Sequence, residues 1–179
     1  MNDRPRAGIV CMPREMLHLL LELTGQADME TLRAAGDAGG PALLHAFSHW
    51  LADGGTDDVA DLPVEVFRQR AAEFFQWCGW GATSLSTGTN SLIEVSISDS
   101  WEARRDQSPE SGCHVTTGLL HGFFAALAGY EVGVMEIECA GLGSGETCRF
   151  VIGTPEMVDS IYAGLSAGSA YEEIVGSAG

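Results

Sequence analysis

Two cysteines and two glutamates lie around a glycine-rich turn near the C-terminal third of the chain. Glu136, Glu138 and Cys139 precede glycines at positions 141, 143 and 145, and Cys148 follows them. A strand that ends at Cys139 and another that starts at Thr147 would bring the two sulfurs together across a hairpin. Because zinc prefers thiolate ligands in structural sites, this segment has the residues of half a metal site.

A structural zinc ion takes four ligands in a tetrahedron, so two further donors must lie elsewhere. By residue type the candidates are Cys113 and Glu136. Cys113 precedes an expected helix, whose positive end favours the thiolate form. The alternative is that the cysteines are small buried hydrophobic residues and the glutamates are solvated. Spacing alone leaves both interpretations open.

The spacing of the two glutamates complicates a simple metal site. In a regular strand Glu136 and Glu138 share one face, and Cys139 points to the other. A β-bulge at the end of the strand would re-aim Glu136, and bulges are common beside functional sites. Which of the two carboxylates reaches the metal is not decided by the sequence.

Hydrophobic periodicity and the placement of glycine and proline predict helices around a small sheet. Helices are expected over 13–23, 28–51, 64–77, 115–127 and from 155 towards 174, and strands over 82–85, 92–97 and on both sides of the cysteine turn. Glycines at 36, 39 and 40 and Pro41 leave either one bent helix or two helices in the second of these. The expected fold class is α+β, with a four-stranded antiparallel meander, helices on one face of it and a zinc-pinned hairpin. Residues 1–179 are expected to form one domain.

Composition excludes several classes of function. The chain has 179 residues, of which 45% are hydrophobic, and a formal net charge of −16 from 25 acidic and nine basic residues, all arginine. Such acidity opposes direct binding to nucleic acid or to an anionic membrane. No apolar run is long enough to span a bilayer or to act as a secretory signal, so we expect a cytoplasmic protein. Five cysteines in a reducing compartment favour metal binding over disulfides.

Five aromatic residues could line a cavity for a flat apolar ligand. They are Trp77, Trp80, Trp101, Phe123 and Phe124. Taken singly, each is better explained as ordinary core, and Trp101 is the strongest candidate for ligand contact.

No catalytic motif is present. The sequence has no phosphate-binding loop, no dinucleotide-binding glycine motif after a strand, no serine nucleophile elbow and no lysine for a Schiff base. A zinc ion with four protein ligands also has no open position to activate water. We therefore assign no catalytic residues, and the sequence favours a binding protein over an enzyme while leaving both open.

The cysteine-containing segments resemble a known family. The run from Cys113-His114 to Glu131-Val132, the motif Glu136-x-Glu138-Cys139 and the triplet Cys148-Arg149-Phe150 are similar to the 4-vinyl reductase domain family. The same pattern is similar to the related aromatic-sensing N-terminal domain of XylR-type transcriptional activators. The resemblance covers residues 113–153, and Ser100-Trp101-Glu102-Ala103 extends it upstream.

This resemblance implies a zinc ion held by Cys113, Glu136, Cys139 and Cys148. It also implies a pocket between the sheet and its helices for hydrocarbon, phenolic or tetrapyrrole-like molecules, and a homodimer. The first hypothesis is a sensor or carrier of a small hydrophobic or aromatic ligand. The second is an accessory factor or reductase of (bacterio)chlorophyll synthesis that acts on a vinyl tetrapyrrole. The third is a protein-interaction adaptor with an acidic docking surface.

Overall fold

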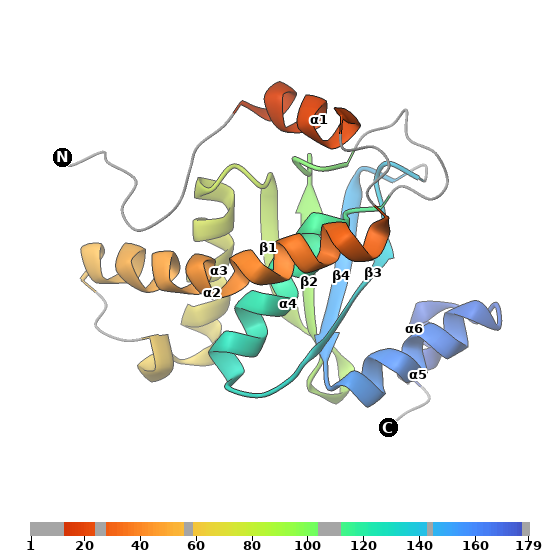
Figure 1. Cartoon of the computed structure of the whole chain (residues 1–179). Helices are drawn as coiled ribbons and strands as arrows, with labels where there is room; N and C mark the ends of the chain where they lie inside the picture. The colour runs from red at the N-terminus through yellow and green to blue at the C-terminus, as the bar shows by residue number, and fades with distance from the viewer. Residues whose placement is uncertain (1–12, 24–27, 56–58, 104–111, 143–144, 177–179) are drawn as a thin grey trace.

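Two β-hairpins flank a central helix, and the remaining helices precede and follow them (Figure 1). A computed structural model describes residues 13–23, 28–55, 59–103, 112–142 and 145–176. The helices are α1 Arg14–Leu23, α2 Met29–Asp53, α3 Val64–Trp77, α4 His114–Ala128, α5 Pro155–Ser166 and α6 Tyr171–Gly176, with short 3₁₀ turns at Val59–Asp61 and Thr89–Ser91. None of the described helices is both long and apolar enough to cross a bilayer.

The helix ends follow local chemistry. Asp28 caps α2 by accepting a 2.7 Å hydrogen bond from the backbone N–H of Thr31, and Gly129 ends α4 in the left-handed conformation at φ 72°. Of the two alternatives for the second helix, α2 is a single helix that continues through Pro41. The expected last helix is instead two, because the chain turns at Gly168 with φ 90°.

The sheet has the four antiparallel strands expected, but their order differs from a meander. The strands are β1 Ala82–Thr87, β2 Ile93–Ser98, β3 Gly133–Glu138 and β4 Thr147–Gly153, in the spatial order β1-β2-β4-β3. Because α4 forms a long connection between the hairpins, β3 reaches the outer edge and β4 returns to the centre. The nearly continuous apolar run of β4 suits this central position, whereas β3 carries two glutamates at the edge.

Helices cover both faces of the sheet, which corrects the expectation of one covered face. The larger core packs α2, α3 and α4 against residues such as Val95, Ile97 and Phe150. Figure 1 shows α2 and α4 crossing in front of the sheet. A second, smaller core joins Leu92 and Val151 to α5 and α6. Residues of a strand alternate between faces, so a strand with apolar residues at successive positions serves both cores.

Helices α2 and α4 cross in direct backbone contact. A Cβ atom added at Gly40 would lie 2.3 Å from the Cα of Gly122, and one added at Gly118 would lie 2.0 Å from the carbonyl oxygen of Arg33. Only glycine fits at this separation. The crossing fixes α4 against α2, and through α4 it fixes Cys113 at the N-terminus of that helix.

Candidate metal centre and adjoining residues

A β-bulge separates the two glutamates of β3. Glu136 is paired with Phe150 and Glu138 with Arg149, so Ile137 is an extra residue in the ladder. Cross-strand partners share a face, and Glu136 therefore points with Phe150 toward α4. Glu138 points with Arg149 to the other face, where the two side chains form an ion pair at 3.6 Å. The bulge thus selects Glu136 over Glu138 as a neighbour of the cysteines.

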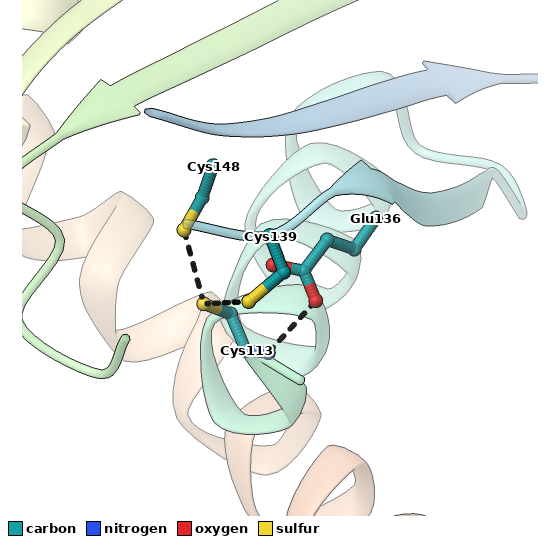
Figure 2. Close-up of side chains that lie close together, drawn as sticks. All are labelled: Cys113, Glu136, Cys139 and Cys148. Carbon is teal, nitrogen blue, oxygen red and sulfur yellow. Dashed lines mark hydrogen bonds between the residues drawn. The ribbon is translucent and has the colours of Figure 1, made fainter. Parts of the chain in front are cut away.

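Four donors from three elements converge at the N-terminus of α4 (Figure 2). The Sγ of Cys113 lies 3.5 Å from that of Cys148 and 4.0 Å from that of Cys139. The donor atoms of these cysteines and of Glu136 all lie within 4.8 Å of one another. In a tetrahedral zinc site with bonds of ~2.3 Å, sulfurs lie about 3.8 Å apart. The four candidate ligands are therefore spaced so that one metal ion could be held by all of them.

One oxygen of Glu136 has a partner and the other has none. Its Oε2 accepts a 2.8 Å hydrogen bond from the backbone N–H of Cys113. Its Oε1 is buried with no hydrogen-bond partner in the described part of the chain. A buried carboxylate oxygen without a partner is costly, and a metal ion would satisfy it. The orphaned atom favours a cation in the cluster over a simple core of thiols.

The acid–base properties of the cluster point the same way. Hydrogen bonds with Cys113 and Cys139 lower the pKa of Cys148 to about 4, and contacts with Cys139 and Cys148 raise the pKa of Cys113. Burial, followed by the nearby charge of Cys139, raises the pKa of Glu136 to about 7. These buried acidic groups cannot all ionise together at neutral pH without repelling one another. A divalent cation would relieve that repulsion and release protons on binding.

Three consecutive residues connect the cluster to its surroundings. The hydroxyl of Ser100 lies 3.9 Å from the Sγ of Cys113. The backbone N–H of Trp101 donates to the carbonyl of Trp80 at 3.2 Å. The buried carboxylate of Glu102 accepts from the N-terminus of α4. No role was predicted for Ser100 or Glu102 from the sequence, although both lie in the motif that extends the family resemblance upstream.

Helix α1 docks on the same segment. Arg14 forms a 2.8 Å ion pair with Asp99, and the Nε2 of His18 lies 2.6 Å from the carbonyl oxygen of Trp101. The outer side of α1 leaves Met16 and Leu19 about half exposed, at 49% and 53%.

The five aromatic candidates occupy different environments. Phe123 and Phe124 lie in the larger core, and Trp80 is stacked on Phe75 with ring centroids 4.7 Å apart. Trp77 is 54% exposed at the end of α3. Trp101 is half-buried against the larger core, and its indole Nε1 is buried without a hydrogen-bond partner among the described residues. Only Trp101 therefore offers a ligand an unused polar contact from a buried position.

A shallow pocket of about 340 Å³ borders the cluster. Its lining includes Ser100 and Ala140. Both residues also contact the candidate metal donors. The backbone N–H of Ala140 donates to the Sγ of Cys148 at 3.4 Å, and the hydroxyl of Ser100 lies 3.9 Å from the Sγ of Cys113. Ser100 and Ala140 therefore separate the cysteine cluster from this pocket.

The chain is similar to known proteins in sequence over one segment and in fold over most of its length. Residues 93–154 match the model of the V4R domain family, which confirms for that segment the family resemblance read from the cysteine motifs. No curated protein is similar enough in sequence to count as a match.

Solved structures with TM-scores above 0.5 share the fold over most of the chain. The phenol-responsive sensory domain of the transcription activator PoxR, solved with phenol, is similar with a TM-score of 0.61 and 15% identity, covering 88% of this chain and 82% of that one. Subunit 3 of a trafficking protein particle complex from Naegleria fowleri, covalently bound to palmitic acid, has a TM-score of 0.56 and 10% identity over 78% and 89% of the two chains. A vinyl-4-reductase family protein from Methanocaldococcus jannaschii has a TM-score of 0.47 and 16% identity over 82% and 83%.

Proposed function

We propose that this chain is a zinc-containing domain that binds a small hydrophobic or aromatic molecule and acts as its sensor or carrier. The observation that carries the proposal is the convergence of Cys113, Glu136, Cys139 and Cys148, with one carboxylate oxygen left unpaired. Three thiolates and a carboxylate are a ligand combination that suits zinc in a closed tetrahedral site. Such an ion would tie the N-terminus of α4 to the β3–β4 hairpin and would have no open position for catalysis.

The class of ligand is inferred from Trp101 and from the structural neighbours. A buried indole N–H without a partner favours a molecule that brings an acceptor oxygen on an apolar body. Two proteins with the same fold are described with ligands of this broad kind, phenol and palmitic acid. Trp80, Phe123 and Phe124 would supply the apolar wall behind Trp101, whereas Trp77, which is 54% exposed at the end of α3, lies outside the proposed wall.

The proposed location and assembly of the protein rest on its charge and on the family resemblance. With a formal net charge of −16 the chain is a poor ligand for nucleic acid. A cytoplasmic homodimer formed by the single domain 1–179 would meet its hydrophobic ligand in solution and pass the signal to a partner protein.

The metal is tested by elemental analysis of the purified full chain beside two variants and a control. Cys139→Ser and Glu136→Ala remove one donor each, whereas Cys78→Ser removes a half-buried cysteine outside the cluster. We expect one zinc ion per chain in the wild type and in Cys78→Ser, and loss of zinc with lower thermal stability in the other two. A folded wild type without stoichiometric metal would refute the zinc site.

The ligand is tested separately by calorimetric titration with phenol and with a longer alkylphenol. Trp101→Phe keeps an aromatic side chain but replaces the indole by a smaller ring without the N–H, and Trp77→Phe makes the same change at an exposed site. We expect Trp101→Phe to weaken binding by about tenfold, the value of one hydrogen bond, and Trp77→Phe to leave it unchanged. Absence of binding by both probes, or a tetrapyrrole pigment that copurifies with the chain, would overturn the aromatic-ligand proposal.

A further inference from the structure

Two histidines lie one turn apart on the exposed side of α2. His45 and His49 are spaced i, i+4, both are exposed, and their Nε2 atoms lie 3.2 Å apart. The ring centroids are 4.5 Å apart, and the ring planes are nearly perpendicular at 89°. The same nitrogen of each imidazole therefore lies within hydrogen-bond distance of the other, on the exposed side of the helix.

We infer that His45 and His49 form a second metal site, a bis-imidazole chelate for a divalent cation such as Ni²⁺, Cu²⁺ or Zn²⁺. Imidazole is a preferred ligand of these ions. With metal–nitrogen bonds of ~2.0–2.1 Å, two nitrogens at a tetrahedral ion lie about 3.3 Å apart, close to the observed 3.2 Å. In the absence of an ion, the same distance allows one imidazole to donate its Nε2–H to the other, so the pair is already arranged for chelation.

This site differs in kind from the cysteine cluster. It offers two neutral nitrogens at the surface, with water completing the coordination, whereas the cluster offers buried sulfur and carboxylate donors. The exposed site would therefore exchange its ion readily. The formal net charge of −16 raises the concentration of cations near the chain and favours occupancy.

The position of the pair in α2 gives the chelate a structural effect. Pro41 lies inside this helix, directly after Gly39 and Gly40, and these three residues weaken its middle. An ion held by His45 and His49 would link the two ends of residues 45–49, the second turn after the proline. Ala46 and Phe47 in that turn are buried in the larger core. Cation binding is therefore expected to raise the melting temperature of the chain.

The test is a calorimetric titration of the untagged full chain with NiCl₂ after its stoichiometric zinc has been loaded, with zinc retention checked by elemental analysis. His45→Ala and His49→Ala each leave one imidazole. His121→Ala is the control, because this histidine lies on α4 and contacts Asp37. We expect one Ni²⁺ per wild-type chain and an increase in melting temperature. Binding should be about tenfold or more weaker in each pair variant, since a chelate becomes a single contact, and unchanged in His121→Ala.

Several results would overturn the site. They are an absence of Ni²⁺ binding by the wild type, equal affinity in the wild type and the pair variants, and an equal loss in His121→Ala. The pair is exposed, so its variants should fold with wild-type stability in the absence of Ni²⁺. Cys139→Ser separates this inference from the proposed function, because it should lose zinc and keep the Ni²⁺ site.

Discussion

Glu102 holds Thr116 by two hydrogen bonds to the same carboxylate oxygen. Its Oε2 accepts from the backbone N–H of Thr116 at 2.8 Å and from its hydroxyl at 2.7 Å. Its Oε1 accepts from the backbone N–H of Val115 at 2.9 Å. Cys113 occupies the N-cap position of α4 and makes no capping bond with its side chain. Glu102 therefore caps the N-terminus of α4, and the sulfur of Cys113 remains among the candidate metal donors.

Removing this cap should destabilise the protein. Glu102→Ala leaves two buried backbone N–H groups and the Thr116 hydroxyl without their acceptor, and we expect a loss of about 2–3 kcal/mol in the free energy of unfolding. Urea denaturation measures it. Glu102→Gln keeps an acceptor oxygen and should lose less, and equal losses in the two variants would contradict the capping role.

The same residue should make stability depend on pH. Burial raises the pKa of Glu102 to about 7, against hydrogen bonds that lower it. The folded state therefore binds this proton more tightly than the unfolded state, so the contribution is fully present below about pH 4.5 and is lost as pH rises through 7. Between pH 5.5 and 8 we expect the free energy of unfolding to fall by about 2 kcal/mol from this group. In Glu102→Gln the fall should be smaller by that amount, and an unchanged slope would refute the assignment.

Zinc affinity should weaken in mild acid. The pKa of Glu136 is raised to about 7, chiefly by burial, and its proton must leave before the carboxylate binds a cation. From pH 8 to pH 6 we expect this group alone to lower zinc affinity by about tenfold, in addition to the effect of the thiols. Competition with a chromophoric chelator at both pH values measures this. Glu136→Gln should bind zinc more weakly at pH 8 and lose about one proton from the pH dependence.

The crossing of α2 and α4 should tolerate no side chain at Gly40. A Cβ there would meet the backbone of Gly122 and Phe123 at 2.2–2.4 Å, so we expect Gly40→Ala to cost about 3 kcal/mol or more. Gly39→Ala is the matched control in the same helix. Its Cβ would meet only the end of the Leu119 side chain at 3.1 Å, and a gain in helix propensity offsets that contact. Similar melting temperatures for the two variants would contradict the close approach.

The stability of the layer formed by α5 and α6 should depend on the hydroxyl group of Tyr171. Tyr171 donates a 2.7 Å hydrogen bond to Glu94 on β2, and the guanidinium of Arg149 lies over its ring at 5.5 Å. Tyr171→Phe removes the hydrogen bond and keeps the ring, so we expect a loss of about 1–2 kcal/mol. Tyr162→Phe, at a side chain that is 65% exposed, should show none. Zinc content should stay at one per chain in both variants, because Tyr171 belongs to the opposite core.

Local patterns predicted most elements and the candidate ligands of the metal. Pro63 and the apolar spacing gave α3 over the residues observed, Val64–Trp77. The two cysteines of the hairpin lie together because a short turn leaves them little freedom. A β-bulge near the end of the strand was the predicted way to re-aim Glu136, and the strand register has one at Ile137.

Features that depend on distant contacts were not predictable from such patterns. The strand order follows from where α4 directs the chain, and no spacing within β3 or β4 encodes it. Helix α2 remains whole through Pro41 because its glycines pack on α4, a tertiary contact that outweighs intrinsic propensity. Glu102 lies 13 positions before Val115, so a capping motif within the sequence of α4 could not have predicted its role as the cap.

Strand β4 carries neighbouring residues to opposite sides of the sheet. Cys148 belongs to the donor cluster, whereas Arg149 lies among Glu94, Glu138 and Glu172 beneath α6. A slip of β4 by one residue would exchange the two, placing a guanidinium among the metal donors and a thiol among carboxylates. Both exchanges are unfavourable, so each face of the sheet enforces the alignment that the other needs. The charged network under α6 thereby helps to fix the strand register on which the cysteine site depends.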